Sequence, residues 1–455
     1  MTKLYCARRV MPMASPPVED GAVAVEDSRI VGVGERVALA AKFPEASVEE
    51  FGEAVILPGF VNAHSHLELT AMRGYLEPEE GDFPAWLAKL TKARLQRMTP
   101  DDLYVSAVCG AVEAVRAGVT CVGDASDAAS ASMRALASVG LRGIVYQEAF
   151  GPNPHEAREK FELLREKVLT LRELESERVR VGVSPHAPYS VSAPQLELIA
   201  EYALAESLPL MMHAAESEAE AQFMLSGRGP FAEGLRRRGI DWRAPGISSI
   251  QYLARHGVLR ARPLLAHCLR VDEADLHTLK EFDARVAHCP KSNAKLGHGH
   301  ASLTAFVEHK IKVGLGSDSV ASNNTCDILS EAGFAALLSR ARGDAGSNGR
   351  MMSAEEVLLT ATLGGACALG LEHLTGALVE GLQADLCIIS LNGTHQRPVY
   401  DVAATLVFAS TGRDVILTLV AGREVYRDGR IQTVDEEHVQ ARVNEIAGRI
   451  SGDSG

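Results

Sequence analysis

The stretch ILPGFVNAHSHLEL, from Ile56 to Leu69, carries two histidines directly after an apolar run. His64 and His66 are two residues apart, and side chains at that spacing along a strand point to the same face. Imidazole is the commonest metal ligand in proteins. The pair therefore predicts two ligands of one metal ion at the end of a buried strand.

Four other apolar runs also end in residues that bind metals or move protons. These residues are His186, His213 with Glu216 three positions later, His267 and Asp318. Imidazole and carboxylate together suit a borderline divalent metal such as zinc. Three histidines and one aspartate leave a position for water, whose pKa a bound metal lowers toward about 7.

Hydrolysis also needs a proton to move from the attacking water to the leaving group. We expect Glu216, in HAAE, to carry that proton and His267 to orient the water and stabilise developing charge. His288, one residue inside its strand end, reads as a core histidine. A pocket role stays open for His298 and His300, which lie in the loop-like LGHGHAS.

The elements that would position these residues form a repeating pattern. Eight strand-like runs can be counted, and segments with apolar residues at helical spacing lie between most of them. Eight strand–helix units predict a (β/α)8 TIM-type barrel, in which the strand carboxyl ends share the face that carries active sites. A doubly wound open sheet is the weaker alternative, since no Gly-x-Gly-x-x-Gly follows the first strand.

Both ends of the chain are rich in short strands with glycine-containing turns. We expect residues 1–57 and 371–455 to form one small β-sandwich domain and residues 58–370 to form the barrel. The segment 225–261 is longer than one crossover helix needs and predicts an insertion over the barrel mouth. Its three consecutive arginines, Arg236 to Arg238, read as a solvated helix face, with contact to an anionic ligand as the alternative.

Composition excludes several classes of protein. The chain has 455 residues, a net charge of −13 and a sequence pI of about 5.6, so nucleic acid is not an expected partner. No apolar run reaches the roughly 20 residues of a membrane span, and the N-terminus lacks an export signal. The eight cysteines form no Cys-x-x-Cys, which indicates the cytoplasm and neither disulfides nor a thiolate zinc site. We expect a small-molecule substrate and, from size alone, a homo-oligomer.

The chain resembles the amidohydrolase superfamily, within its group of deaminases and triazine hydrolases. The resemblance rests on PGFVNAHSHLEL, MHAAESEAE, LLAHCLRVDE, CPKSNAKLG and GLGSDSVASNN, and it covers nearly the whole chain. It implies metal ligands at His64, His66, His213 and Asp318, with Glu216 as proton shuttle and His267 as activating imidazole. Binuclear members have a bridging lysine at the end of strand four. VRVGVSPHAPYS has none, so one ion is expected, zinc first and iron or manganese as alternatives.

Further motifs narrow the expected substrate. HSHLEL, SPHAPYSVS and HAAESEAEAQFMLSGRGPF resemble deaminases of 6-aminodeoxyfutalosine, an adenine nucleoside of menaquinone biosynthesis. MRGYLEPEEGDFPAWL shares Met72, Arg73, Gly74 and Trp86 with deaminases of S-adenosylhomocysteine and methylthioadenosine. We therefore expect an adenine-type nucleoside, bound by His186, Arg73 and Trp86. Deamination of guanine or cytosine, hydrolysis of a triazine or cyclic amide, and a metal-binding or scaffold protein without turnover are the alternatives.

Overall fold

Eight parallel strands form a closed barrel in the computed structural model, which describes residues 1–344, 346 and 349–452. The strands are β6 (Phe60–Ser65), β7 (Val119–Ser126), β8 (Arg142–Ala149), β9 (Val179–Pro185), β10 (Met211–Ala214), β11 (Leu264–His267), β12 (Arg285–His288) and β13 (Val313–Leu315). They pair as two runs, β6 to β9 and β10 to β13. Parallel bridges between Val183 and Leu210 and between Ser65 and Asp318 join the two runs. The predicted (β/α)8 barrel is confirmed.

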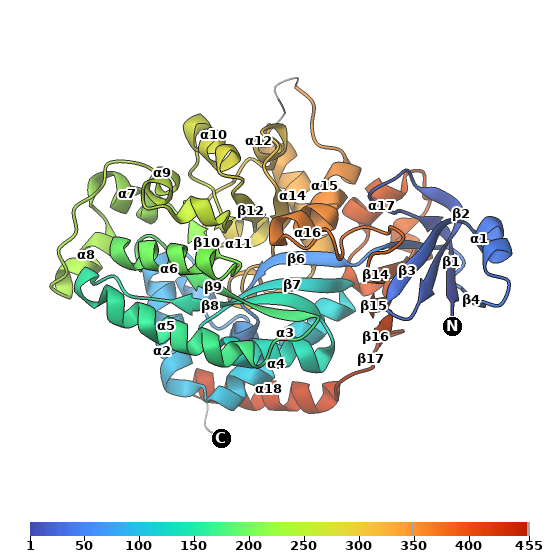
Figure 1. Ribbon diagram of the computed structural model, residues 1–455, viewed down its shortest axis with the longest axis horizontal. Helices are drawn as coiled ribbons and strands as arrows, with labels where there is room; N and C mark the ends of the chain where they lie inside the picture. Colours follow the sequence, from blue (N-terminus) through green and yellow to red (C-terminus); the bar gives the residue numbers. More distant parts are fainter. Residues whose placement is uncertain (345, 347–348, 453–455) are drawn as a thin grey trace.

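Helices between the strands cover the outside of the barrel (Figure 1). They include α3 (Pro100–Arg116), α4 (Ala129–Val139), α5 (Ala157–Arg172), α6 (Ala193–Ala205), α10 (Glu273–Glu281), α12 (Leu303–Glu308) and α14 (Ile328–Ala341). Polar side chains fix where several of them begin: Thr99 and Asp272 form capping boxes at α3 and α10. A further helix, α16 (Leu363–Leu369), packs its Leu369 with Val61 and Ala63 in the barrel interior. α16 thus contributes apolar side chains to the core inside the barrel.

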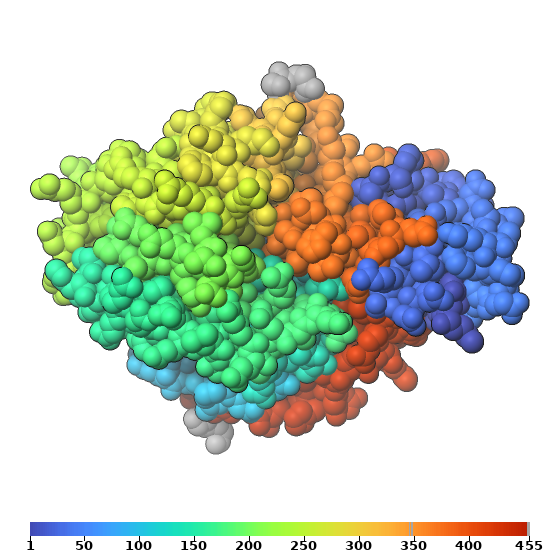
Figure 2. All heavy atoms as spheres, in the orientation of Figure 1, coloured from blue at the N-terminus to red at the C-terminus, as the bar shows by residue number. Residues whose placement is uncertain are grey.

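Strands from both ends of the chain form one nine-stranded sheet beside the barrel. Its N-terminal strands are β1 (Lys3–Val10), β2 (Val18–Glu26), β3 (Arg29–Glu35), β4 (Ser47–Glu50) and β5 (Ala54–Pro58). Its C-terminal strands are β14 (Leu386–Ser390), β15 (Val415–Val420), β16 (Arg423–Arg427) and β17 (Arg430–Ile431). β5 joins the halves, because it pairs with β1 on one side and with β14 on the other. The predicted β-sandwich part from both termini is confirmed. Figure 2 shows the N-terminal part of the chain, in blue, packed against the C-terminal part, in orange and red.

The two parts are tied together at several points. β5 ends at Pro58 and β6 begins at Phe60, so a single residue links sheet and barrel. Arg142 of β8 donates from Nε to Asp385 Oδ2 at 2.7 Å, in a buried pair beside β14. The last helix, α18 (Glu436–Ser451), returns to the barrel, where Arg449 donates to Asp102 of α3. The domain limits given above stay a prediction.

None of the described helices combines the length and the apolar character needed to cross a bilayer. All eight cysteines lie in the described part of the chain, and each has a free thiol.

Candidate functional site

His64 and His66 lie where β6 leaves the barrel, and a buried carboxylate fixes their turn. Asp124, near the end of β7, accepts from Ser65 Oγ at 2.7 Å and from the Leu67 amide at 2.8 Å. His64 is fully buried, and neither ring nitrogen has a hydrogen-bond partner among the described residues. A buried ring that makes no hydrogen bond, with the Asp318 carboxylate 3.3 Å from its Nε2, fits a site where a cation could bind both groups.

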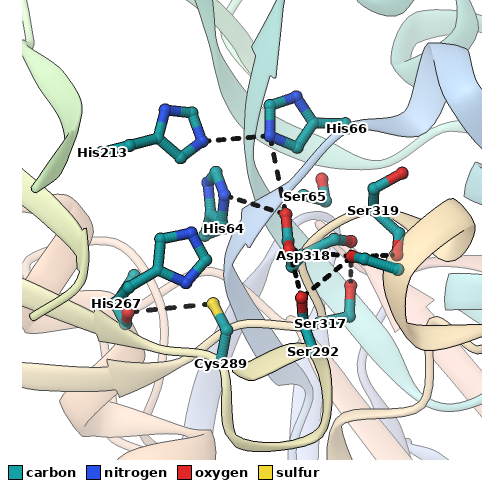
Figure 3. A network of polar contacts seen from close by, with 12 residues as sticks. His64, Ser65, His66, His213, His267, Cys289, Ser292, Ser317, Asp318 and Ser319 are labelled. Carbon is teal, nitrogen blue, oxygen red and sulfur yellow. Dashed lines mark hydrogen bonds and ion pairs between the residues drawn. The ribbon is translucent and has the colours of Figure 1, made fainter. Parts of the chain in front are cut away.

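His213 is the next-to-last residue of β10, and its ring lies beside those of His64 and His66. Its Nδ1 lies 3.0 Å from the carbonyl oxygen of His186, so this nitrogen carries the proton and donates it. The other nitrogen, Nε2, therefore carries a lone pair, and it lies 3.2 Å from His66 Nε2. Figure 3 shows these rings edge to edge beside His64. Two imidazole nitrogens this close either share a hydrogen bond or, when both carry lone pairs, can bind one cation between them.

Asp318 supplies a carboxylate from beyond β13. Its Oδ1 lies 3.3 Å from His64 Nε2 and 3.6 Å from His66 Nε2. Its Oδ2 accepts from Ser292 Oγ at 2.5 Å and Ser322 Oγ at 2.9 Å, which holds the group in place. Burial opposes ionisation, but the contact with His64 and the neighbouring imidazoles outweigh it and hold the pKa of Asp318 well below its usual value.

The residues present fit a divalent metal. His64, His66 and His213 form one group in which a possible ligand atom of each residue lies within 4.8 Å of those of the other two. His64, His267 and Asp318 form a second group by the same measure. The close backbone approach behind His64 requires glycine: a Cβ on Gly316 would lie 2.9 Å from His64 Cβ. Three imidazoles and one carboxylate are a donor set suited to zinc or a similar ion.

Glu216 and His267 face each other beside this cluster. Glu216 Oε1 lies 3.6 Å from His267 Nε2 and 3.6 Å from His298 Nε2. Burial raises the pKa of Glu216 to about 7, so proton uptake and release both lie within reach near neutral pH. Burial would lower the pKa of His267, but Glu216, Asp318 and a hydrogen bond with Asn293 outweigh it and raise that pKa.

Two further side chains hold this pair. Glu220 accepts from the amides of Ala215 and Glu216 at 2.8 and 2.9 Å, which fixes the turn after β10. Asn293 Oδ1 lies 2.9 Å from His267 Nδ1, so Nδ1 carries a proton and Nε2 faces Glu216. Neither residue is exposed. Glu220 and Asn293 therefore position Glu216 and His267 through these hydrogen bonds.

A cavity of about 420 Å3 opens over the cluster and is bordered by the helix α2 (Phe83–Arg97). Its lining includes His66, His213, Glu216, His267 and Asp318. Apolar side chains of α2, among them Phe83, Trp86, Leu87 and Leu90, form one wall. The cavity thus places an apolar surface opposite the hydrolytic groups.

The structure brings two of the three predicted substrate ligands to this cavity. His186 and Trp86 both line it, and Trp86 Nε1 is buried without a hydrogen-bond partner among the described residues. Arg73 does not line it. The Arg73 guanidinium pairs with Glu113 of α3 and donates to the Asn324 carbonyl, so it lies outside the cavity lining in this structure, and its role in substrate binding stays a prediction.

The segment 225–261 also differs from the expectation. It forms α8 (Pro230–Arg237), α9 (Ser249–Arg255) and connecting loops, and none of its described residues lines the cavity. Phe231 of α8 instead stacks on Tyr189, a cavity residue, with ring centroids 3.9 Å apart. The segment therefore supports the wall through Phe231, and Pro230 at the start of α8 lies beside Phe83 and His298 at the same face of the barrel.

Three further histidines were noted in the sequence: His288, His298 and His300. His298 is buried, approaches Glu216 and contacts the Phe83 ring edge-on at 4.6 Å. His300 pairs with Asp344 at 3.4 Å, and His288 is buried at the end of β12.

Sequence reasoning missed four buried polar residues at or near the site: Asp124, Glu148, Glu220 and Asn293. Glu148 follows the apolar run of β8, lines the cavity and has an unpartnered Oε1. Asp124 likewise ends an apolar run, in GVTCVGDAS. A polar residue at a strand end was the signal that could have identified both.

Comparison with known proteins agrees with this geometry. The model of the amidohydrolase family matches residues 55–425. A protein of Nitratidesulfovibrio vulgaris (strain Miyazaki F) named 5-methylthioadenosine/S-adenosylhomocysteine deaminase is 34% identical over 438 residues, covering 94% of this chain and 92% of the relative. A protein of the same name from Syntrophobacter fumaroxidans is 33% identical over 95% of this chain and 94% of its own.

Solved structures share the whole fold. An adenosine deaminase from Xanthomonas campestris with bound zinc has a TM-score of 0.86 at 26% identity, covering 99% of this chain and 98% of its own. An atrazine chlorohydrolase from Arthrobacter aurescens, in complex with zinc, has a TM-score of 0.84 at 22% identity, covering 98% and 99%, and shows the fold alone. The chain belongs to the amidohydrolase family and is a hydrolase that acts on carbon–nitrogen bonds.

Proposed function

We propose that this chain is a zinc-dependent deaminase of an adenine-type nucleoside. The observation that carries the proposal is the pairing of Glu216 with His267 beside a cluster of three histidines and one aspartate, under an apolar cavity wall. The names of the relatives and the zinc-containing adenosine deaminase support the same reaction. His64, His66, His213 and Asp318 would hold the ion.

The proposed reaction replaces the exocyclic amine of a purine by oxygen. A C6–O bond forms from water, the C6–N bond breaks, and ammonia leaves. The metal, when bound, would supply an acidified water at neutral pH. Glu216 takes a proton from the attacking water and returns it to the departing amine. His267, held by Asn293, orients the water and stabilises the charge that develops beside it.

The charges of the cavity wall bear on the substituent beyond the ribose. Arg94 is the only arginine or lysine lining the cavity in the described part of the chain. Its guanidinium is already held by Glu68 at 3.1 Å and Asp127 at 2.9 Å. Glu148 adds a third carboxyl group to this wall. A substrate carboxylate would therefore meet no free cation here.

This arrangement favours a nucleoside with an uncharged substituent. The sequence motifs placed 6-aminodeoxyfutalosine first, but its benzoate, like the amino-acid carboxylate of S-adenosylhomocysteine, would need a cation. Methylthioadenosine carries only a thiomethyl group, which suits the apolar side chains of α2. We accordingly rank methylthioadenosine first and the carboxylate-bearing nucleosides second.

Release of ammonia by the zinc-loaded protein tests the proposal. Methylthioadenosine and adenosine should be deaminated, with kcat/KM for methylthioadenosine at least about tenfold above that for S-adenosylhomocysteine or 6-aminodeoxyfutalosine, since an unpaired charge costs at least about 1.4 kcal/mol. A faster reaction with either carboxylate-bearing nucleoside would overturn the ranking. Turnover of guanine, cytosine or a triazine without any adenine nucleoside would overturn the substrate class.

A further inference from the structure

A second cavity, also of about 420 Å3, lies at the amino-terminal ends of the barrel strands, opposite the metal cluster. Its walls come from the starts of β9, β11 and β12, from the segment before β10 and from residues 368–371, which end α16 and continue just beyond it. None of the groups assigned to the proposed reaction lies there. A cavity of this volume is large enough for a small molecule.

Three arginines and no acidic residue line this cavity in the described part of the chain. They are Arg180 on β9, Arg262 before β11 and Arg285 at the start of β12. No hydrogen bond or ion pair of their guanidinium groups is formed with the described residues, whereas Arg94 and Arg142 in the same barrel are each paired with carboxylates. Arg180 and Arg262 are exposed to solvent, so the group whose missing partner needs an explanation is the partly buried Arg285.

Arg285 is the most restricted of the three. It is only partly exposed, and its Nε is buried without a hydrogen-bond partner. Its guanidinium rests on Gly370, where a Cβ would lie 2.6 Å from Nη1 and where the backbone φ is +73°. Glycine at this position therefore gives the guanidinium its room. A buried N–H donor without an acceptor costs about 1–3 kcal/mol unless a ligand supplies one.

A neutral hydroxyl completes the polar lining. Tyr146 of β8 reaches the cavity from the barrel interior. Burial raises the pKa of Tyr146, and the positive charges of Arg285 and Arg180, which line the same cavity, act against that rise. The phenol is thus a donor at neutral pH.

We propose that this cavity is a binding site for a small phosphate-bearing anion, held by Arg285, Arg180 and Arg262. Guanidinium groups present paired N–H donors that match phosphate oxygens, and three of them balance a di- or trianion. The phosphate is either free inorganic phosphate or pyrophosphate, or the phosphate ester of a small metabolite. The site is separate from the proposed deamination and does not depend on it.

Calorimetric titration of the zinc-loaded full chain with inorganic pyrophosphate, phosphate and adenosine monophosphate, at constant ionic strength, tests the site. One equivalent of pyrophosphate or adenosine monophosphate should bind saturably. Arg285→Gln should weaken that binding at least about tenfold, because a hydrogen bond to a charged group is lost. Arg285→Lys should retain part of it, and Arg237→Gln, an exposed arginine of α8, should change nothing. Preference for the nucleotide over pyrophosphate would identify an ester as the ligand.

The active centre is the competing location for an anion, because a bound metal also attracts phosphate. If pyrophosphate binds in the arginine cavity, it should not compete with the nucleoside substrate, so the initial rate of ammonia release should not fall when pyrophosphate is added. Pyrophosphate should also still bind to protein from which the metal has been removed. Equal affinity in wild type and Arg285→Gln, loss of binding with the metal, or no saturable binding at millimolar pyrophosphate would each overturn the proposal. Thermal unfolding of Arg285→Gln near the wild-type temperature would show that the variant is folded.

Discussion

Replacing Glu216 by glutamine separates proton transfer from every other role of this residue. The carboxyl group is buried and lies 3.6 Å from both His267 and His298. Glutamine has nearly the same shape, so the packing is kept. The backbone amide of residue 216 would still donate to Glu220. What disappears is the ability to take up a proton and release it.

The expected loss can be estimated from the two proton transfers. A general acid or base contributes about 10²–10⁴-fold, and Glu216 serves both the attack of water and the departure of the amine. We expect kcat to fall by at least about 10³-fold, equivalent to about 4 kcal/mol in the activation free energy. Bound metal should stay at the wild-type level, because Glu216 is not among the clustered ligand residues.

Steady-state ammonia release together with elemental analysis measures both quantities. Glu218→Gln is the matched control: it lies two residues away, its side chain is 61% exposed, and it should leave kcat unchanged. If Glu216→Gln keeps more than about a tenth of the wild-type kcat, another group carries the proton. If the variant loses its metal, Glu216 is a ligand and the assignment is wrong.

Three further outcomes follow from the same geometry. Elemental analysis should find one zinc equivalent per chain; two tightly bound equivalents would contradict the expectation that the missing strand-four lysine limits the site to one ion. Asn293→Ala should lower kcat by about 10–100-fold with unchanged metal content, because the hydrogen bond that fixes the His267 ring is lost; unchanged kcat would remove Asn293 from this role. Activity should fall as the pH drops through the pKa of Glu216, since only the carboxylate accepts a proton. Burial raises that pKa to about 7 and a bound cation lowers it again, so an acid limb centred well above 7 in the pH profile of kcat/KM would contradict the assignment.

The barrel and the residues at its strand ends could be predicted from the sequence for a physical reason. Each barrel strand is an apolar run because it is buried on both faces, and the polar residue that ends the run must lie at the shared carboxyl edge. His64, His213, His267 and Asp318 all follow this rule. Their placement at one edge depends only on the number and direction of the strands, and both can be predicted from the pattern of apolar residues in the sequence.

Pairing between distant charges could not be predicted in this way. Arg73 resembles a residue beside the substrate, but its partner Glu113 lies 40 positions later, on the face of α3 that packs against the turn after β6. Arg94 carried no motif, yet Glu68 and Asp127 place it in the cavity wall. Which charge meets which carboxylate depends on helix orientation, and a strand count leaves that open.

Backbone conformation explains why buried polar residues gather around the site. Ala215, His267 and Asp318 all have positive φ, at 52°, 74° and 56°, although none of them is glycine. Such conformations cost about 1–3 kcal/mol each and persist where the surroundings hold them. Each has a nearby polar anchor: Glu220 binds the Ala215 amide, Asn293 binds the His267 ring, and Ser292 and Ser322 bind the Asp318 carboxylate. These hydrogen bonds hold the strand ends in the conformation that brings their side chains together, so the anchoring residues belong to the site as much as the groups they position.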